Sequence, residues 1–352
     1  MSAVLVKQIK KKAEDEGFIL AGITTPDEPP HIATYEDWLD AGRHASMDYL
    51  AREDARARRA DPHLILPEVQ SILVLAFPYE PTLTPSSSPE GRGEPKGKIA
   101  SYALTDDYHI FLKEKLQAIV SFIESKVGHE IPNRWYTDTG PILERDLAQR
   151  AGIGWIGKNT CLINPNVGSY FFLAEILLGI ELPADQPFVS DHCGTCTRCI
   201  DACPTQAILP NRTLDSNLCI SYLTIENKGE ISEELRPQIG DLIFGCDICQ
   251  QVCPWNGKVL QRSNVQTVER SIDPEQNLIS ELSLTPQEFN KKFKNNPVKR
   301  AKRRGYLRNV AVALGNVGNE SAIPALEKAL DDIEPLIRDH ARWALNKIKG
   351  ND

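Results

Sequence analysis

The chain contains the stretch Cys193-Gly-Thr-Cys196-Thr-Arg-Cys199-Ile-Asp-Ala-Cys203-Pro204, then Cys219, and then Cys246-Asp-Ile-Cys249-Gln-Gln-Val-Cys253-Pro254. The first run has the spacing of bacterial ferredoxins, in which three close thiolates hold one iron–sulfur cluster and the fourth ligates a second cluster. A proline directly follows the last cysteine of each run. The stretch therefore predicts a ferredoxin-like domain that holds two 4Fe–4S clusters.

These eight cysteines divide into two ligand sets of four. The second run is one ligand short, because Ile243 stands where its first cysteine would fall, and Cys219 is the substitute. The alternative is a pair of structural zinc sites, since Cys-x₂-Cys pairs are also typical of zinc. The two prolines and the x₃ spacings favour iron. We assign one cluster to Cys193, Cys196, Cys199 and Cys253, and the other to Cys246, Cys249, Cys203 and Cys219.

Length and composition indicate a globular protein without membrane contact. The chain has 352 residues, 41% of them apolar, which is enough for a large core in one or two domains. Thiolates held for clusters imply a reducing compartment, so we expect a cytoplasmic protein, and a monomer. No apolar run reaches the roughly 18 residues of a membrane span, and residues 1–17 resemble an amphipathic helix rather than an export signal. We interpret the ninth cysteine, Cys161, as a packing residue.

Charge is distributed unevenly along the chain. Net charge is −8, yet residues 291–308 hold nine basic residues and no acidic one, which leaves 31 basic against 48 acidic residues elsewhere. An acidic body with one strongly basic segment indicates a local site for a polyanion. The alternative is a solvated charged surface with no partner.

Strands and helices alternate through the first half of the chain. Apolar runs predict strands at residues 18–24, 71–77, 98–104 and 169–182, and helical patterns span residues 1–17, 38–59, 106–127 and 141–151. Residues 81–98 are rich in Pro, Ser, Gly and Glu and predict a mobile loop. We therefore expect an α+β body at residues 1–185, the iron–sulfur domain at 186–258 and a separate tail at 259–352.

The tail contains an internal repeat. Leu307-Arg308-x₂-Ala311-x-Ala313-Leu314-Gly315 is echoed about thirty residues later by Ile337-Arg338-x₂-Ala341-x₂-Ala344-Leu345. This period is typical of α-helical, HEAT-like repeats. Two partial copies are too few for an independent solenoid, so we expect the tail to dock on the body.

The clusters predict an electron-transfer reaction rather than a simple carrier. A ferredoxin needs only about sixty residues, whereas some 190 residues precede the cysteines here. The Cys-x₃-Cys-x₂-Cys loop of radical enzymes is absent, and no Gly-x-Gly-x-x-Gly follows a predicted strand. We therefore expect a two-electron reduction, with one electron from each cluster.

Four further stretches resemble the epoxyqueuosine reductases, and the resemblance extends over nearly the whole chain. They are Asp138-Thr-Gly-Pro-Ile-Leu-Glu-Arg145, Ala151-Gly-Ile-Gly-Trp-Ile-Gly-Lys-Asn-Thr160, Cys219-Ile-Ser-Tyr-Leu-Thr-Ile-Glu226 and Gly245-Cys-Asp-Ile-Cys-Gln-Gln-Val-Cys-Pro-Trp-Asn256. The resemblance implies a nitroreductase-like, cobalamin-binding core whose substrate is epoxyqueuosine in the anticodon of tRNA. Electrons from an external donor would pass through the clusters to cobalt.

The residues themselves give no sign of cobalamin. An Asp-x-His-x-x-Gly signature is missing, because Asp61-Pro-His63 and Asp107-Tyr-His109 both have Leu where Gly is required. A bound corrinoid would therefore lack that lower histidine ligand. On the resemblance, the candidate cobalamin contacts are Arg59, Tyr102, Asp138, Lys158, Asn159, Ser169, Ser221 and Tyr222.

Asp138 is the predicted proton donor. The resemblance implies this role, and epoxide opening creates an alkoxide that needs an acid as charge develops. We expect burial under an apolar cofactor to raise its pKa. The alternative is that Asp138 or Thr139 merely caps a helix that opens at Pro141. Glu144 and Arg145 are interpreted as no more than an ion pair.

The basic segment is the predicted tRNA-binding surface, which would contact phosphates without reading sequence. There are two alternatives. One is a reductive dehalogenase of small molecules, and the other is a non-enzymatic electron carrier or RNA-binding scaffold. Neither explains the clusters, the large body and the basic segment together. The predicted RNA contacts are Lys291, Lys292, Lys294, Lys299, Arg300, Lys302, Arg303, Arg304 and Arg308.

Overall fold

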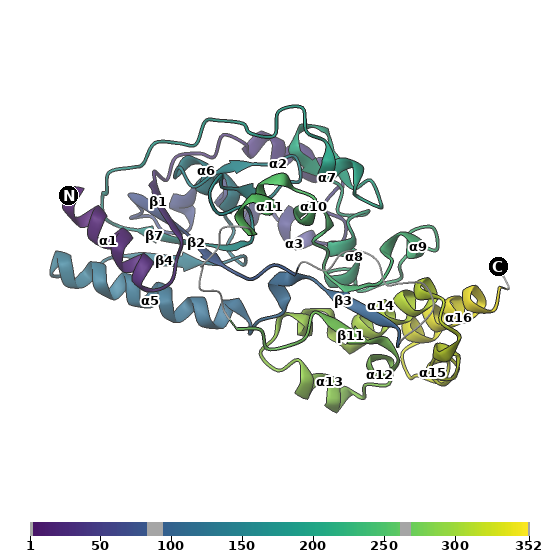
Figure 1. The fold of residues 1–352 in the computed structure, drawn as a ribbon. Helices are drawn as coiled ribbons and strands as arrows, with labels where there is room; N and C mark the ends of the chain where they lie inside the picture. The colour runs from purple at the N-terminus through teal and green to yellow at the C-terminus, as the bar shows by residue number, and fades with distance from the viewer. Residues whose placement is uncertain (1–2, 83–93, 261–268, 351–352) are drawn as a thin grey trace.

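The computed structural model describes residues 3–82, 94–260 and 269–350 (Figure 1). Its main sheet has four antiparallel strands in the order β1-β2-β7-β4. The two central strands, β2 and β7, pair along their full length, with Leu73 opposite Ile176. The strands are β1 (Leu20–Thr24), β2 (Ser71–Pro78), β4 (Asn133–Tyr136) and β7 (Phe171–Leu178).

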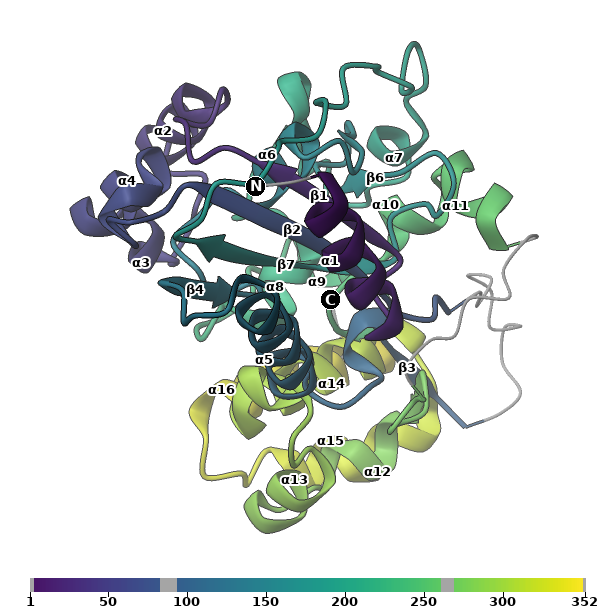
Figure 2. The ribbon, with the colours of Figure 1, turned by 90° about the vertical axis from the view of Figure 1, so that its left-hand side faces the viewer.

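Successive side chains of β2 point to opposite faces of this sheet, and both faces are apolar. Helices therefore cover the sheet on both sides, which gives three layers. Leu73 and Leu75 point to one face, which α1 (Ala3–Asp15) and α5 (Tyr108–Val127) cover (Figure 2). Ile72 and Val74 point to the opposite face, against α6 (Glu144–Arg150). Each fully buried side chain of this kind contributes about 1.5–3 kcal/mol, so the central strands anchor the body.

The predicted elements are largely confirmed, with shifted ends. Helix α5 begins at Tyr108, where the Asp107 carboxylate accepts a hydrogen bond from the His109 backbone, and Gly128 ends it with φ 82°. Helix α6 begins at Glu144 rather than at residue 141. The single helix predicted at residues 38–59 is wrong, because a turn through Gly42 (φ 65°) breaks it. The observed helices are α2 (Ile32–Asp40), α3 (Asp48–Ala51) and α4 (Glu53–Ala60).

A second sheet joins segments that lie far apart in the sequence. Its order is β10-β3-β11, so β3 (Lys96–Ile99) lies between β10 (Leu242–Phe244) and β11 (Glu275–Asn277). The strand predicted at residues 98–104 is therefore shorter, and a 3-10 helix follows it at Ser101–Ala103. Of the predicted loop at residues 81–98, positions 83–93 lie outside the described residues, and its end belongs to β3.

The iron–sulfur segment consists of short elements. A small hairpin and several single-turn helices lie along it, and α7 packs against α10. The hairpin is β8 (Ile208–Leu209) with β9 (Thr213–Leu214), and a similar one, β5 (Trp155–Ile156) with β6 (Leu162–Ile163), lies in the preceding body. The helices are α7 (Arg198–Asp201), α8 (Ile220–Ile225), α9 (Arg236–Ile239), α10 (Ile248–Gln251) and α11 (Pro254–Leu260).

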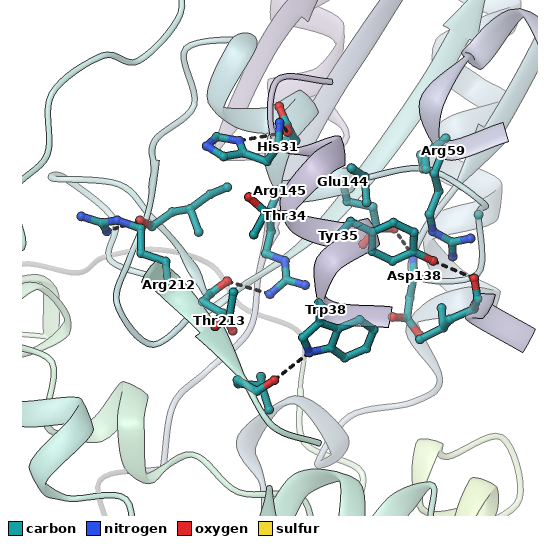
Figure 3. Close-up of a pocket in the computed structure, with 18 residues that line it drawn as sticks. His31, Thr34, Tyr35, Trp38, Arg59, Asp138, Glu144, Arg145, Arg212 and Thr213 are labelled. Atoms are coloured by element: carbon teal, nitrogen blue, oxygen red, sulfur yellow. Dashed lines mark hydrogen bonds and ion pairs between the residues drawn. The ribbon is translucent and has the colours of Figure 1, made fainter. Parts of the chain in front are cut away.

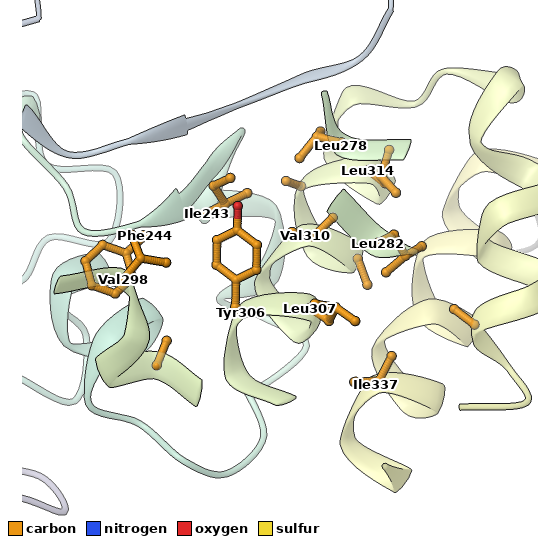
Figure 4. Packing of buried hydrophobic residues seen from close by; sticks show 14 of the residues in the cluster. Ile243, Phe244, Leu278, Leu282, Val298, Tyr306, Leu307, Val310, Leu314 and Ile337 are labelled. Carbon is orange, nitrogen blue, oxygen red and sulfur yellow. The ribbon is translucent and has the colours of Figure 1, made fainter. Parts of the chain in front are cut away.

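The tail docks on the body, as expected for two helical repeats. Its core includes Phe244 from the iron–sulfur segment together with Leu278, Tyr306 and Ile337 (Figure 4). The two repeat helices, α14 (Lys302–Val317) and α16 (Pro335–Lys349), pack side by side. The other tail helices are α12 (Leu278–Leu282), α13 (Pro286–Lys292) and α15 (Ile323–Ala329).

No helix within the described ranges combines the length and the apolar character needed to cross a bilayer.

Two glycines on α14 should respond oppositely to substitution by alanine. A Cβ at Gly315 would lie 2.9 Å from the Ala344 Cα atom and 2.7 Å from the Trp343 ring, whereas one at Gly305 would meet only Ala301, at 3.8 Å. We expect Gly315→Ala to cost about 1–3 kcal/mol through overpacking. Gly305→Ala should be neutral or stabilise by up to about 1 kcal/mol through helix propensity. Thermal melting of both variants checks this, and equal Tm values would contradict it.

Candidate functional site: thiol groups, a cavity and a basic rim

The structure brings the predicted cysteine ligands together in two groups. Burial raises the pKa of the Cys199 thiol, and the neighbouring Cys193 and Cys253 add to that rise. Burial likewise raises the pKa of Cys246 to about 12, with Cys219 and Cys203 close to it. Iron would reverse these shifts, since a coordinating thiol loses its proton. Cysteines from both runs therefore contribute to each group.

Nitrogen donors surround the sulfurs, as anionic cluster ligands require. The Trp155 ring N–H lies 3.5 Å from the Cys193 sulfur, and the Ala207 backbone N–H lies 3.3 Å from the Cys203 sulfur. The Arg212 guanidinium is 3.8 Å from the Cys193 sulfur. In the described part of the chain, no three metal-ligating side chains converge on a point for a single ion. The N–H groups beside Cys193 and Cys203 could donate hydrogen bonds to the sulfurs of a bound cluster.

Cys161 lies beside Cys249 and hydrogen-bonds to it. Sequence reasoning treated Cys161 as a packing residue, but this contact makes it the rival to Cys219 as the fourth ligand of the second group. Both thiols are only partly exposed.

A cavity of about 1560 Å³ opens between the body, the iron–sulfur segment and the tail. Small-molecule pockets are typically about 300–1,000 Å³, so this space suits a larger cofactor or a cofactor with a substrate group. Five predicted contacts line it together with Cys219. These contacts are Arg59, Tyr102, Asp138, Ser221 and Tyr222.

The other three predicted contacts hold the protein together. Lys158 donates to the backbone oxygens of Gly194 and Cys196, at 2.7 and 3.0 Å, so it fixes the first cysteine loop. Asn159 donates to the Cys249 oxygen at 3.4 Å. Ser169 is buried in a network with Asn256 and Gln250 beside a smaller cavity of about 290 Å³. None of the three is among the residues that line the large cavity.

Asp138 lies where three cavities meet, including one of about 320 Å³ (Figure 3). Its backbone has φ 60°, a conformation that non-glycine residues adopt mainly where surrounding structure enforces it. The Tyr108 hydroxyl donates to Asp138 Oδ2 at 3.0 Å, and His109 Nε2 lies 3.7 Å from that oxygen. The capping alternative is wrong, because the side chain of Asp138 makes no cap for α6.

The electrostatics of Asp138 differ from the expectation. Burial by itself would raise its pKa, but the hydrogen bond and charge of His109, with the Tyr108 hydroxyl, lower it below the ordinary value. Burial would lower the pKa of His109, yet Asp107 and Asp138 raise it to about 9. The raised pKa expected for Asp138 under a bound cofactor stays a prediction. A histidine cation keeps Asp138 ionised near neutral pH.

Sequence reasoning missed the role of Glu144. Its Oε1 atom accepts a hydrogen bond of 2.6 Å from the Asp138 backbone N–H, while Arg145 donates to the Thr160 oxygen (Figure 3). The predicted Glu144–Arg145 ion pair is therefore not what orients these side chains. Burial and then the charge of Asp138 raise the pKa of Glu144 to about 8. The sequence did contain one indication of this role, because Glu144 belongs to the same Asp138–Arg145 motif, six residues after Asp138.

The basic segment is only partly free for a polyanion. Arg308 is wrong as an RNA contact, because it is fully buried and donates to the backbone oxygens of Leu223, Asn227 and Gly229. Acidic residues from other elements also neutralise part of the segment, which the sequence had suggested was unpaired. These ion pairs are Lys292–Glu281, Arg300–Glu226 and Arg303–Asp332. The exposed basic residues are Lys291, Lys294, Lys299, Arg300, Lys302 and Arg304.

Comparison with known proteins identifies the family. Residues 59–139 match the profile described as "Epoxyqueuosine reductase QueG, DUF1730", residues 192–256 match a 4Fe-4S double cluster binding domain, and residues 307–332 match a PBS lyase HEAT-like repeat. The epoxyqueuosine reductase of Xanthomonas campestris is 40% identical over 98% of this chain and 99% of its own. The chain belongs to the epoxyqueuosine reductase family.

Other members of the family support the same assignment. The Escherichia coli epoxyqueuosine reductase is 38% identical over 97% of this chain and 89% of its own. A crystal structure of an epoxyqueuosine reductase with an epoxyqueuosine-modified tRNA stem loop has a TM-score of 0.88 and 32% identity, over 98% of this chain and 90% of that one. The Bacillus subtilis epoxyqueuosine reductase, with its aspartate catalytic loop swung out of the active site, has a TM-score of 0.86, with 32% identity over the same shares.

The protein is therefore an oxidoreductase that reduces epoxyqueuosine, and it contains an iron–sulfur domain for two 4Fe–4S clusters. The dehalogenase and electron-carrier alternatives are set aside by this family membership.

The two rival thiols give a direct test of the ligand assignment. We expect the anaerobically prepared protein to hold about eight irons per chain, four in each cluster. Cys219→Ser should lose about half of the iron, whereas Cys161→Ser should keep all of it, because only Cys219 belongs to the predicted ligand set. Iron analysis and cluster absorbance measure both variants. Iron loss in Cys161→Ser but not in Cys219→Ser would reverse the assignment.

Proposed function

We propose that this enzyme removes the epoxide oxygen of epoxyqueuosine within the anticodon of tRNA, using cobalamin bound in the 1560 Å³ cavity. Two electrons and two protons convert the epoxide into an alkene and release its oxygen as water. The observation that carries the proposal is that Asp138, Cys219 and Arg300 all line this one cavity. An acid, an electron source and a cationic rim thus reach the same space.

Cobalamin suits the residues that line this cavity. Its size exceeds that of ordinary small-molecule sites, and Arg59, Tyr102, Ser221 and Tyr222 offer donors for corrin amides and the phosphate. When bound, cobalamin would supply a strongly reduced cobalt to the epoxide carbon. His109 would not ligate cobalt, because Asp107 and Asp138 hold it as a cation. The body would then be a cobalamin-binding core of the nitroreductase-like kind.

The positions of the thiols suggest the direction of electron flow. The residues between Cys193, Cys196 and Cys199 are exposed, so an external donor protein can approach this segment. Cys219 lines the large cavity, so its cluster would be the one next to cobalt. Electrons would therefore enter at the group of Cys193 and leave from the group of Cys219.

Asp138 is the group that would protonate the oxygen of the opening epoxide. Its side chain is 59% exposed, and it lines all three cavities described above. Tyr108 and His109 fix Oδ2, so the other oxygen, Oδ1, is free to face the substrate. Displacement of cavity water by substrate and cofactor would weaken the ionised form and favour proton uptake.

The tRNA would approach over the basic segment. Lys299 and Arg300 lie at the rim of the large cavity, and Lys302 and Arg304 continue the exposed positive surface. Phosphates would bind there, and the modified nucleotide would turn into the cavity. We place this reaction in the cytoplasm and assign the enzyme as a monomer.

Asp138→Asn should abolish most turnover without loss of either cluster. The amide cannot deliver a proton, and general acid catalysis is typically worth about 10²–10⁴-fold. Asp106→Asn is the matched control. Asp106 is exposed and directly precedes Asp107, which lines the large cavity, but Asp106 is not among the residues that line it. Queuosine formation in tRNA with a chemical reductant measures both variants. Parental turnover in Asp138→Asn would show that the acid is a different group.

Charge reversal on the rim should weaken tRNA binding in a salt-dependent way. The triple change Lys299→Glu, Lys302→Glu and Arg304→Glu should raise Kd by at least about tenfold and lower the slope of log K against log salt by about two. The control changes Lys7, Lys113 and Lys126 to Glu. These lysines are exposed, and the control changes the net charge by the same amount as the rim variant. If both triples weakened binding alike, the effect would be one of net charge and the rim would not be the binding surface.

A further inference from the structure

If the proposed function is correct, the reaction needs more protons than Asp138 can supply. Release of the epoxide oxygen as water consumes two protons per turnover, whereas one carboxyl group carries one. His109 and Tyr108 also keep Asp138 ionised near neutral pH in the protein by itself. The site therefore requires a second proton donor that stays protonated beside Asp138.

We propose that Glu144 stores this proton and passes it to Asp138 inside the cavity. Glu144 is the first residue of α6, and its Oε1 atom lies 2.6 Å from the Asp138 backbone nitrogen. Both side chains line the cavity of about 320 Å³ and the one of about 290 Å³, so a water molecule can bridge the two carboxyl groups.

The transfer balances without a further reactant. The O–H bond of the Glu144 carboxyl breaks and an O–H bond forms on the Asp138 carboxylate, so negative charge moves from Asp138 to Glu144. No electron moves in this step. Solvent in the cavity then returns a proton to Glu144. Glu144 never contacts the substrate in this scheme, so it acts through Asp138.

The surroundings of Glu144 favour its neutral form. Burial and the charge of Asp138 raise its pKa to about 8, although the hydrogen bond from the Asp138 backbone N–H and the charges of Arg145 and Arg59 act in the opposite direction. Behind it, Glu175 on β7 is fully buried, and among the described residues neither of its carboxyl oxygens has a hydrogen-bond partner. A carboxylate there would be uncompensated, so Glu175 is also neutral. The charged or titratable groups that share the two smaller cavities with Glu144, or act on it by charge, are Asp138, Arg59, Arg145, Glu175, Tyr108, Tyr35, Tyr79, His31, Asp146, Arg212 and Cys161.

The first test uses the protein with its clusters but without substrate. Infrared difference spectra should contain a protonated carboxyl band that disappears as pH rises through about 8 and is missing in Glu144→Gln. In Asp138→Asn this band should disappear at lower pH, because the negative charge that raises the pKa of Glu144 is gone. Asp146→Asn is the matched control, because Asp146 is buried on the same helix but bonds to His31.

The second test is kinetic. Because the donor must be protonated, kcat of the parent should fall as pH rises through about 8. Glu144→Gln keeps an acceptor for the Asp138 N–H, so the KM for tRNA should stay unchanged. Its kcat at pH 7 should fall at least about tenfold, and kcat should no longer decrease as pH rises through about 8. Glu144→Asp, which retains a carboxyl group, should recover part of the rate.

Two results would overturn the proposal. One is a carboxyl titration that is the same in the parent, in Glu144→Gln and in Asp138→Asn. The other is an unchanged alkaline limb in Glu144→Gln, which would identify His109 as the proton store. Neither result depends on the identity of the acid at the substrate, which the turnover of Asp138→Asn tests separately. Cluster absorbance of each variant verifies that it has folded.

Discussion

The buried guanidinium of Arg308 holds the parts of this protein in register. It donates to Leu223 and Gly229 at 2.6 Å and to Asn227 at 3.0 Å, all of them backbone oxygens at or just beyond the end of α8. Burial lowers its pKa to about 10, so it stays charged near neutral pH. A helix C-terminus attracts such a cation, and charged hydrogen bonds are worth about 1.5–3 kcal/mol each. The tail is thereby fixed to the helix that follows Cys219.

That attachment determines the shape of the cavity. Helix α8 carries Ser221 and Tyr222 on one wall, and the segment before α14 contributes Lys299 and Arg300 to the rim. The opposite wall comes from the body, with Asp138 in the loop between β4 and α6. Each of the three segments thus brings one requirement of the proposed reaction: a proton donor, an electron source and a surface for phosphates. None of the segments could form the cavity by itself.

The chemistry of the site depends on a conflict between two stabilising effects. Burial favours neutral carboxyl groups, while the His109 cation favours an ionised Asp138. The structure separates these effects in space, because His109 lies beside Asp138, whereas burial raises the pKa of Glu144 and of Glu175. A pair with one ionised and one neutral carboxyl avoids the repulsion that two neighbouring carboxylates would have.

The sequence by itself determined the features that depend on spacing within one segment. These are the two cysteine runs, the apolar runs of β2 and β7, the helix at α5 and the repeat in the tail. Tertiary structure decided what depends on distant segments meeting. It buried Arg308, directed Lys158 to a cysteine loop, paired His109 with Asp138 and placed Glu144 under the Asp138 backbone. The physical reason is that burial and charge pairing are properties of a residue's surroundings, and those surroundings come from parts of the chain that no local pattern connects.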